Sequence, residues 1–286
     1  MRFWTFQVLN GLTSGAILFF VTVGLTVVTG LMRVLNLAHG ALFLVGGYAG
    51  LATIEATGSF VAGLVVGALV SGILGFGIRQ AFATALLGHT FHQVLLTLGI
   101  SFILGNGILQ IFGGTPRRLL APSYLSGSID VFGVTYPRYR LALVILSVVA
   151  GLALWLFWER SSVGAMVRAC VDDRPMAAAM GIPVERVFSV VFALGAALAG
   201  LTGVMAAPVK GLHIGLDFEV LLLAVIVMVV GGMGSLTGAF IASMVVGMID
   251  VMGQAQFPEL SSLTLFAPVI LILIIRPQGL LGRPLT

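Results

Sequence analysis

Long apolar runs constrain the fold of this chain more than any other feature of its sequence. A membrane-spanning helix needs about 20 apolar residues, and in lipid a helix satisfies its own backbone hydrogen-bonding groups. The runs predict an all-α, polytopic membrane helix bundle of eight or nine spans, with residues 1–286 forming a single transmembrane domain. One or both of the shorter runs, 40–55 and 238–252, are expected to be half-helices or to be tilted in the bundle. The nine runs lie at residues 6–31, 40–55, 60–78, 93–113, 140–158, 187–207, 218–233, 238–252 and 263–276.

Composition and charge exclude other classes of protein. Only 8% of the residues are charged, against about 25% in an average soluble domain, and the mean hydropathy is +1.16. These values exclude a soluble enzyme and a disordered or fibrous chain. The net charge of +4 fits positively charged loops in contact with anionic membrane lipid. The basic residues do not cluster with aromatic residues on one segment, so no nucleic-acid partner is expected.

The loop 159–186 holds eight of the 24 charged residues of the chain. It is expected to form two short amphipathic helices outside the bilayer. Asp172 and Asp173 are placed at the start of the second helix, because carboxylates favour helix N-termini. Gly181 is placed just past its C-terminal end in a left-handed conformation, and Pro183 prevents continuation. The alternative is an ordinary solvated loop with incidental helix.

The positive-inside rule leaves the orientation of the chain tied between two arginine-rich loops, 114–139 and 159–186, which must lie on opposite sides. The segment after the last run carries Arg276 and Arg283 and falls on the same side as 159–186. This favours a cytoplasmic 159–186 loop and, with nine spans, an N-terminus outside. Cys170 is then expected to be cytoplasmic and partly covered by a partner.

Polar residues inside the apolar runs are candidates for a substrate path, because such residues are costly in a membrane and often mark a route. The alternative role is hydrogen bonding between helices. Ser101 and Asn106 lie about 140° apart around a helix, so the candidates cannot all line one pore. The candidates are Asn10, Asn36, His39, Thr97, Ser101, Asn106 and Gln110.

Several chemistries are excluded by residues that the sequence lacks. Lys210 is the only lysine and follows Val209, whereas a P-loop needs Gly-Lys, so any ATP must be bound by another subunit. Cys170 is the only cysteine, which excludes an internal disulfide and a cysteine-based metal site. His89 and His92 have no carboxylates nearby, and no metal site is expected. No catalytic set and no cofactor of its own are expected for this chain.

Four ordered motifs carry a resemblance over essentially the whole chain, weakest across residues 55–160. On these motifs the chain resembles the permease subunits of branched-chain amino acid ABC importers of the LivH type. The motifs are Asn36-Leu37-Ala38-His39-Gly40, the stretch 164–182, the stretch 231–238 (GGMGSLTG) and the stretch 276–282 (RPQGLLG).

The resemblance implies a transport subunit and not an enzyme. It implies two ATPase subunits, a second, LivM-like permease and a periplasmic or lipid-anchored solute-binding protein, all at the cytoplasmic (inner) membrane. The solute would be a branched-chain amino acid or a related small amino acid, amide or carboxylate. The 159–186 loop would couple ATPase closure to the spans. The coupling candidates are Arg168, Asp172, Asp173, Arg174, Ala178, Gly181 and Ile182.

Two other functions remain open from the residues. One is a sugar-type ABC permease, which is a related class. The other is a single-subunit secondary transporter, which needs buried carboxylates for ion coupling. Only Asp250 lies well inside a predicted span, whereas Asp217 and Glu219 are placed near a membrane face. This scarcity argues against ion coupling.

Overall fold

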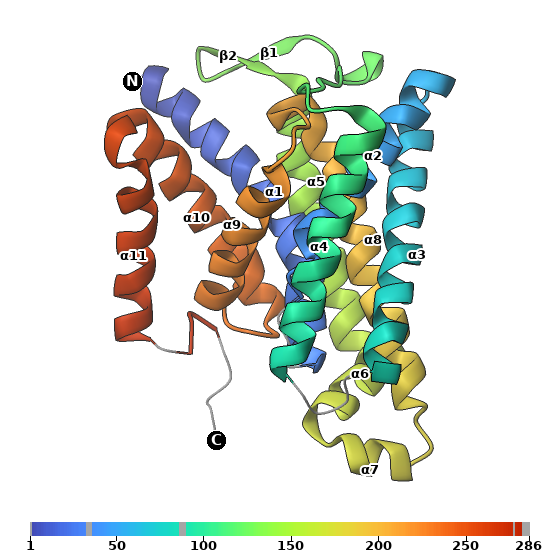
Figure 1. Cartoon of the computed structure of the whole chain (residues 1–286). Helices are drawn as coiled ribbons and strands as arrows, with labels where there is room; N and C mark the ends of the chain where they lie inside the picture. Colours follow the sequence, from blue (N-terminus) through green and yellow to red (C-terminus); the bar gives the residue numbers. More distant parts are fainter. Residues whose placement is uncertain (1, 33–35, 86–89, 277, 282–286) are drawn as a thin grey trace.

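The computed structural model describes residues 2–32, 36–85, 90–276 and 278–281, and these residues form a helical bundle (Figure 1). The described residues contain eleven α-helices, two 3₁₀ turns and one β-hairpin. Nine of the helices coincide with the nine apolar runs. The helices are α1 (Arg2–Met32), α2 (His39–Thr57), α3 (Phe60–Ala85), α4 (Thr90–Phe112), α5 (Arg138–Arg160), α6 (Ser162–Asp172), α7 (Arg174–Ala179), α8 (Val184–Lys210), α9 (Leu216–Gly231), α10 (Leu236–Gln256) and α11 (Ser261–Ile275).

Within the described residues, seven helices are long and apolar enough to cross a membrane: α1 to α5, α8 and α10. Of the two alternatives for runs 40–55 and 238–252, the half-helix is wrong, because α2 has 19 residues and α10 has 21; the tilted helix stays a prediction. Helix α10 continues through polar residues that the apolar run omits. The short helices are instead α9, with 16 residues, and α11, with 15. At about 1.5 Å per residue, α9 covers about 24 Å, less than the roughly 30 Å of a bilayer core.

Helices α1, α2, α3 and α8 pack at very close range because glycines face one another. A Cβ on Gly46 of α2 would lie 2.2 Å from the Cα of Gly200 on α8. A Cβ on Gly203 of α8 would lie 2.0 Å from the carbonyl oxygen of Phe43. Backbones this close exclude any side chain at these positions, and such contacts are how membrane helices associate without a hydrophobic driving force.

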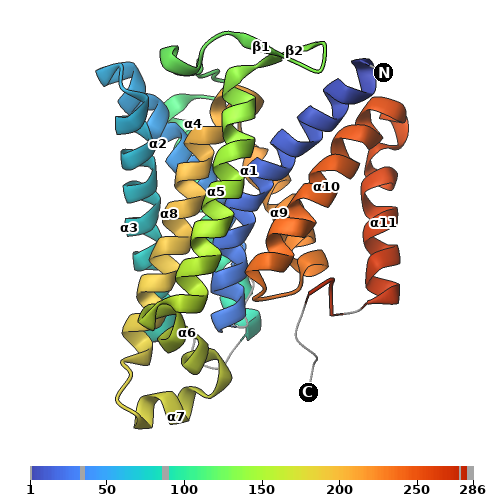
Figure 2. The ribbon, with the colours of Figure 1, turned by 180° about the vertical axis from the view of Figure 1, so that it is seen from behind.

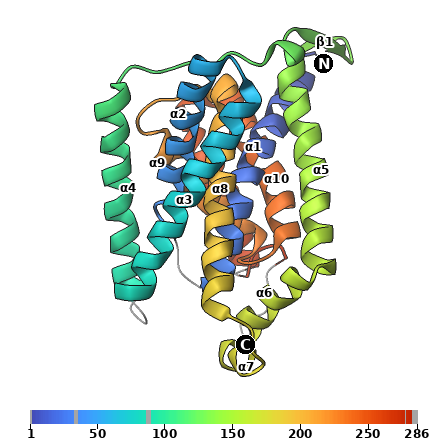
Figure 3. The same ribbon diagram turned by 90° about the vertical axis from the view of Figure 1, so that its right-hand side faces the viewer.

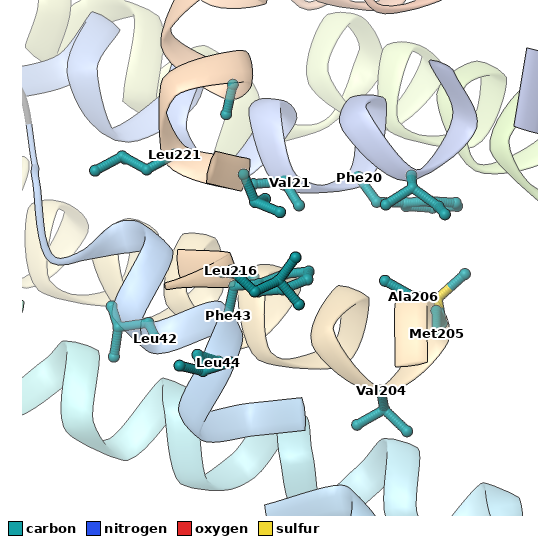
Figure 4. Close-up of a cluster of buried hydrophobic side chains, with 14 of the residues drawn as sticks. Phe20, Val21, Leu42, Phe43, Leu44, Val204, Met205, Ala206, Leu216 and Leu221 are labelled. Atoms are coloured by element: carbon teal, nitrogen blue, oxygen red, sulfur yellow. The ribbon is translucent and has the colours of Figure 1, made fainter. Parts of the chain in front are cut away.

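The apolar core lies between α1, α2, α8 and α9 (Figure 4). Phe20 of α1, Phe43 of α2, Met205 of α8 and Leu216 of α9 are all buried there. The Tyr139 hydroxyl of α5 donates to the Met205 carbonyl oxygen at 2.7 Å. This hydrogen bond joins α5 to the core helices and removes a polar group from the apolar surroundings.

The two ends of the bundle differ (Figures 1 and 2). One end holds the N-terminus and the antiparallel hairpin of β1 (Ser128–Val131) and β2 (Val134–Pro137). The other end holds α6 and α7 and the last described residues of the chain. The prediction that the loops 114–139 and 159–186 lie at opposite ends is confirmed. Figure 3 shows α4 and α5 on opposite flanks of the bundle, with α6 and α7 below it.

Candidate functional site

The α6–α7 pair forms a compact unit at the end of the bundle opposite the hairpin. Ser161 caps α6 by accepting a hydrogen bond from the Gly164 amide at 3.0 Å. Asp173 caps α7 by accepting from the Met176 amide at 2.9 Å. Asp173 therefore has the predicted place at the start of a helix. Asp172 does not, because it is the last residue of α6.

The C-terminal end of α7 is closed by Gly181. Gly181 has φ +82°, as the sequence predicts. The Ile182 amide donates to the Ala177 carbonyl at 3.1 Å, and the Gly181 amide donates to the Ala178 carbonyl at 3.0 Å. This pair of bonds is a Schellman motif, which needs a left-handed residue at this position. The turn sets the direction in which the chain leaves α7 for α8.

One face of α7 packs inward and the other is open. Ala177 is buried in a small apolar cluster with Val167 and Cys170 of α6 and Phe188 of α8, and Ile182 is half-buried against it. On the open side Ala178 is exposed, and the side chains of Met176 and Met180 are 59% and 76% exposed. Large apolar side chains at the tip of a rigid element are typical of a surface that binds another protein.

The chain itself covers Cys170, which is 2% exposed. The expectation that a partner hides it is wrong, because side chains of α6, α7 and α8 do so. Burial raises the pKa of the Cys170 thiol, partly offset by the nearby positive charge of Arg174.

Arginines fasten the α6–α7 unit to the bundle. The Arg168 guanidinium donates to the carbonyl oxygens of Trp158 and Glu159 at the end of α5. Arg174 pairs with Glu185 of α8 and lies over the Phe188 ring, 5.1 Å from its centroid. Arg168 and Arg174 are thus positioned to hold the unit in place.

Arg79 of α3 joins the same network, and sequence reasoning missed it. Its Nη2 atom lies 2.6 Å from the Glu185 Oε2 atom, and its side chain is only 3% exposed. The third apolar run ends at residue 78, one residue before Arg79, whereas α3 extends to Ala85. Glu185 of α8 therefore bridges Arg79 of α3 and Arg174 of α7.

A second polar site lies where α2 begins. The Asn36 Oδ1 atom accepts from the Ala38 amide at 3.1 Å, which caps the turn that starts α2. His39 is buried, and its Nε2 atom donates to the Val21 carbonyl of α1 at 3.0 Å. These contacts give Asn36 and His39 a structural place between α1 and α2.

Helix α9 begins beside the start of α2, inside the bundle. The link 211–215 descends from the end of α8, so α9 starts below its neighbours (Figure 1). A Cβ on Gly40 would lie 2.1 Å from the Asp217 carbonyl oxygen. Asp217 is 4% exposed, so it is buried within the bundle. The sequence feature that could have located the start of α9 is Gly215, a left-handed residue just before a first turn that holds Asp217 and Glu219.

The other substrate-path candidates are scattered. Asn10 lies near the hairpin end, where its Oδ1 atom accepts from Arg140 at 2.7 Å and from Tyr136 at 3.2 Å. Thr97 and Ser101 are buried on one face of α4, and the Thr97 hydroxyl bonds to backbone carbonyls of its own helix. Asn106 and Gln110 are exposed. The structure therefore does not gather the candidates around one path, and their role in transport stays a prediction. His89 lies outside the described residues.

Two of the four sequence motifs meet at the α6–α7 end. The Leu280 amide donates to the Val230 carbonyl at 2.7 Å, and the Leu281 amide donates to the Gly231 carbonyl at 3.2 Å. The segment after α11 thereby satisfies carbonyl groups at the C-terminal end of α9 that no helical partner reaches. The turn between α9 and α10 lies beside α6, and residues of both line one cavity.

In the part of the chain that the structure describes, nine apolar helices, with a pair of short helices outside one end, define a multi-pass helical membrane protein. Residues 7–274 match the family described as the permease component of branched-chain amino acid transport systems. The chain belongs to this family and is a transport component. This match supports the importer interpretation over the sugar-type permease and the secondary transporter.

Known relatives cover nearly the whole chain. It is 30% identical to the high-affinity branched-chain amino acid transport permease LivH of Escherichia coli, over 97% of this chain and 95% of LivH. It is 27% identical to BraD of Pseudomonas aeruginosa with the same coverage. It is also 29% identical to LivM of Salmonella typhimurium, over 97% of this chain and 72% of LivM.

A solved structure supports the fold. PsaBC from Streptococcus pneumoniae, in complex with a Fab, superposes with a TM-score of 0.51, over 94% of this chain and 91% of the other. The sequence identity is 17%, so the likeness concerns the arrangement of helices alone.

Proposed function

We propose that this chain is the membrane-spanning subunit of an ATP-driven importer in the cytoplasmic (inner) membrane. Its solute is a branched-chain amino acid or a related small amino acid, amide or carboxylate. The family and the names of the relatives support this assignment. The chain itself carries out no covalent chemistry and holds no cofactor.

ATP is bound and hydrolysed on two separate subunits. Lys210, the only lysine, supports this division of labour. It ends α8, and its Nζ atom donates to the Glu219 Oε1 atom of α9 at 3.0 Å. A P-loop lysine must instead reach the phosphates from a glycine-rich loop between a strand and a helix.

The ATPase subunits bind the open side of α7. The observation that carries this proposal is the exposure of Met176 and Met180 on the α6–α7 unit, which hydrogen bonds and ion pairs attach to the bundle. Ala178 lies in the contact, and Asp172 lies on the exposed rim. Gly181 and Asp173 shape the two ends of α7, while Arg168, Arg174 and Ile182 hold it against the bundle. Closure of the ATPase subunits moves α7, and Glu185 passes that movement to α3 and α8.

We assign the remaining partners to two other surfaces, the exposed apolar sides of the helices and the hairpin end. A second, LivM-like permease packs against part of the exposed apolar surface, and membrane lipid covers the rest. A periplasmic or lipid-anchored solute-binding protein docks at the hairpin end. The buried junction of α2 and α9, with His39 and Asp217, is where we place the narrow part of the solute path.

Reconstituted uptake tests the assignment. In liposomes holding this chain, its LivM-like partner, the ATPase subunits and the binding protein, we expect leucine uptake that requires ATP inside. Ribose serves as the matched solute control and should not be taken up. ATP hydrolysis by the purified chain alone would contradict the proposal. So would leucine uptake by the chain alone, driven by a proton gradient.

A further inference from the structure

Two cavities on the flank between α5 and α10 are neighbours and share lining residues. The first has a volume of about 250 Å³ and lies at the α6 end, where it is lined by Trp158, Glu159, Arg168 and Asp172. The second, of about 300 Å³, lies deeper in the membrane part and is lined almost entirely by apolar side chains of α1, α5 and α10. Trp155, Leu236 and Thr237 line both cavities. The pair therefore has a polar head and an apolar tail.

We propose that this site binds one zwitterionic phospholipid, with its acyl chain in the groove between α5 and α10 and its headgroup against α6. The lining of the groove supports a lipid tail. Its walls are almost entirely apolar side chains of α1, α5 and α10, and an acyl chain has no hydrogen-bonding groups that such walls would leave unsatisfied.

The charges of the polar cavity define the headgroup. Arg168 uses two of its guanidinium donors on the carbonyls of Trp158 and Glu159, which leaves others to bind a phosphate. Two carboxylates, Glu159 and Asp172, line the same cavity and suit an ammonium group. An anionic headgroup would meet two negative charges and one positive charge. A headgroup with both a phosphate and an ammonium matches the cavity better.

The tryptophans and Gly151 that line the site also fit a phospholipid. Trp155 lines both cavities and Trp158 lines the polar one, and tryptophans are enriched at the interface of a membrane. Gly151 leaves the groove open, because a Cβ there would lie 3.2 Å from the Phe240 ring and 3.4 Å from Phe19. The lipid would touch α6 and the start of α10 at once, so it would brace the coupling unit against the α9–α10 turn.

Quenching of tryptophan fluorescence by brominated lipids tests the site in the full chain in nanodiscs. The chain has three tryptophans, and Trp4→Phe removes the one at the hairpin end. In that background we expect brominated phosphatidylethanolamine to quench saturably, with an apparent affinity several-fold higher than that of brominated phosphatidylglycerol. Glu159→Gln should reduce this preference.

Two neighbouring substitutions provide a matched pair. Val148 and Val149 are both about half exposed on α5, but only Val148 lines the groove. Val148→Phe should reduce quenching to the level of bulk lipid, whereas Val149→Phe should leave it unchanged. Gly151→Leu should repeat the effect of Val148→Phe. Equal quenching by both lipids, unaffected by Val148→Phe and Gly151→Leu, would show ordinary annular lipid and overturn the proposal. The assay needs no ATPase subunits, so its result is independent of the proposed transport function.

Discussion

Gly181 determines how the chain leaves α7 and hence how that helix is presented. Its left-handed backbone allows the two hydrogen bonds that close the helix. A residue with a Cβ pays a conformational cost there, and a β-branched residue pays more. Gly127, beside the hairpin at the other end, has φ +90° and an equally open surrounding. A substitution at either glycine would therefore cause similar backbone strain, but at opposite ends of the bundle.

We predict that Gly181→Val lowers uptake and retention of the ATPase subunits, while Gly127→Val lowers neither. Both substitutions should cost about 1–2 kcal/mol of folding stability, so their melting temperatures should fall by similar amounts. Uptake and co-purification are measured on the same membranes. Equal loss of coupling in both variants would mean that strain, and not the position of α7, is responsible.

Cys170 provides a second test at this scale. Because the thiol is buried and its pKa is raised, the reactive thiolate is scarce at neutral pH. We predict that maleimide labels it very slowly in folded protein, at a rate that increases above pH 8, and promptly after denaturation. Rapid labelling of the folded chain at pH 7 would show that α6 and α7 are not packed on α8.

At the scale of elements, much could be predicted and part could not. The apolar runs located all nine long or short apolar helices, and Asp173 and Gly181 located the ends of α7. Helix lengths were harder to predict, because α10 continues through Gln254 to Gln256, beyond the end of its apolar run at residue 252. The sequence also could not predict which face of α4 is buried. Which of Thr97 and Asn106 is buried depends on the helices beside α4, and the sequence does not specify those neighbours.

Close helix contacts depend on glycines that a substitution can test. Gly46→Ala should destabilise the bundle by about 1–3 kcal/mol, because the new methyl group meets the Gly200 backbone and the helices must move apart. Gly77→Ala in α3 is the control, since a Cβ there meets nothing within 4 Å, and alanine favours the helix by about 0.5–1 kcal/mol. Thermal unfolding in one detergent compares the two. A stable Gly46→Ala variant would contradict the contact between α2 and α8.

Over the whole molecule, the sequence predicted which loops lie on opposite sides, and the structure has them at opposite ends. It did not predict the contacts that unite distant segments. The bond network of Arg79, Arg174 and Glu185 joins residues more than 100 positions apart. Likewise, Asp217 becomes buried only because α9 starts inside the bundle. Such positions depend on how the helices are arranged, which no local pattern specifies.

Labelling of single cysteines tests the orientation. In a Cys170→Ala background, Ser128→Cys lies on the hairpin and Ala178→Cys on α7, and both native residues are exposed. We predict that a membrane-impermeant maleimide labels Ser128→Cys in intact cells and Ala178→Cys only in inverted vesicles. The reverse pattern would invert the orientation. Labelling of both residues from one side would contradict the bundle as described.

Co-purification of the ATPase subunits with the Ala178→Arg variant tests the coupling site most directly. An arginine at the open tip of α7 would place an unpaired charge and a long side chain in the proposed contact. We predict normal insertion into the membrane but binding of the ATPase subunits weakened by more than about tenfold, which corresponds to about 1.4 kcal/mol, with loss of uptake. Ser128→Arg on the hairpin should bind them as the wild type does. Wild-type binding and uptake by Ala178→Arg would contradict the assignment of α7 as the ATPase contact.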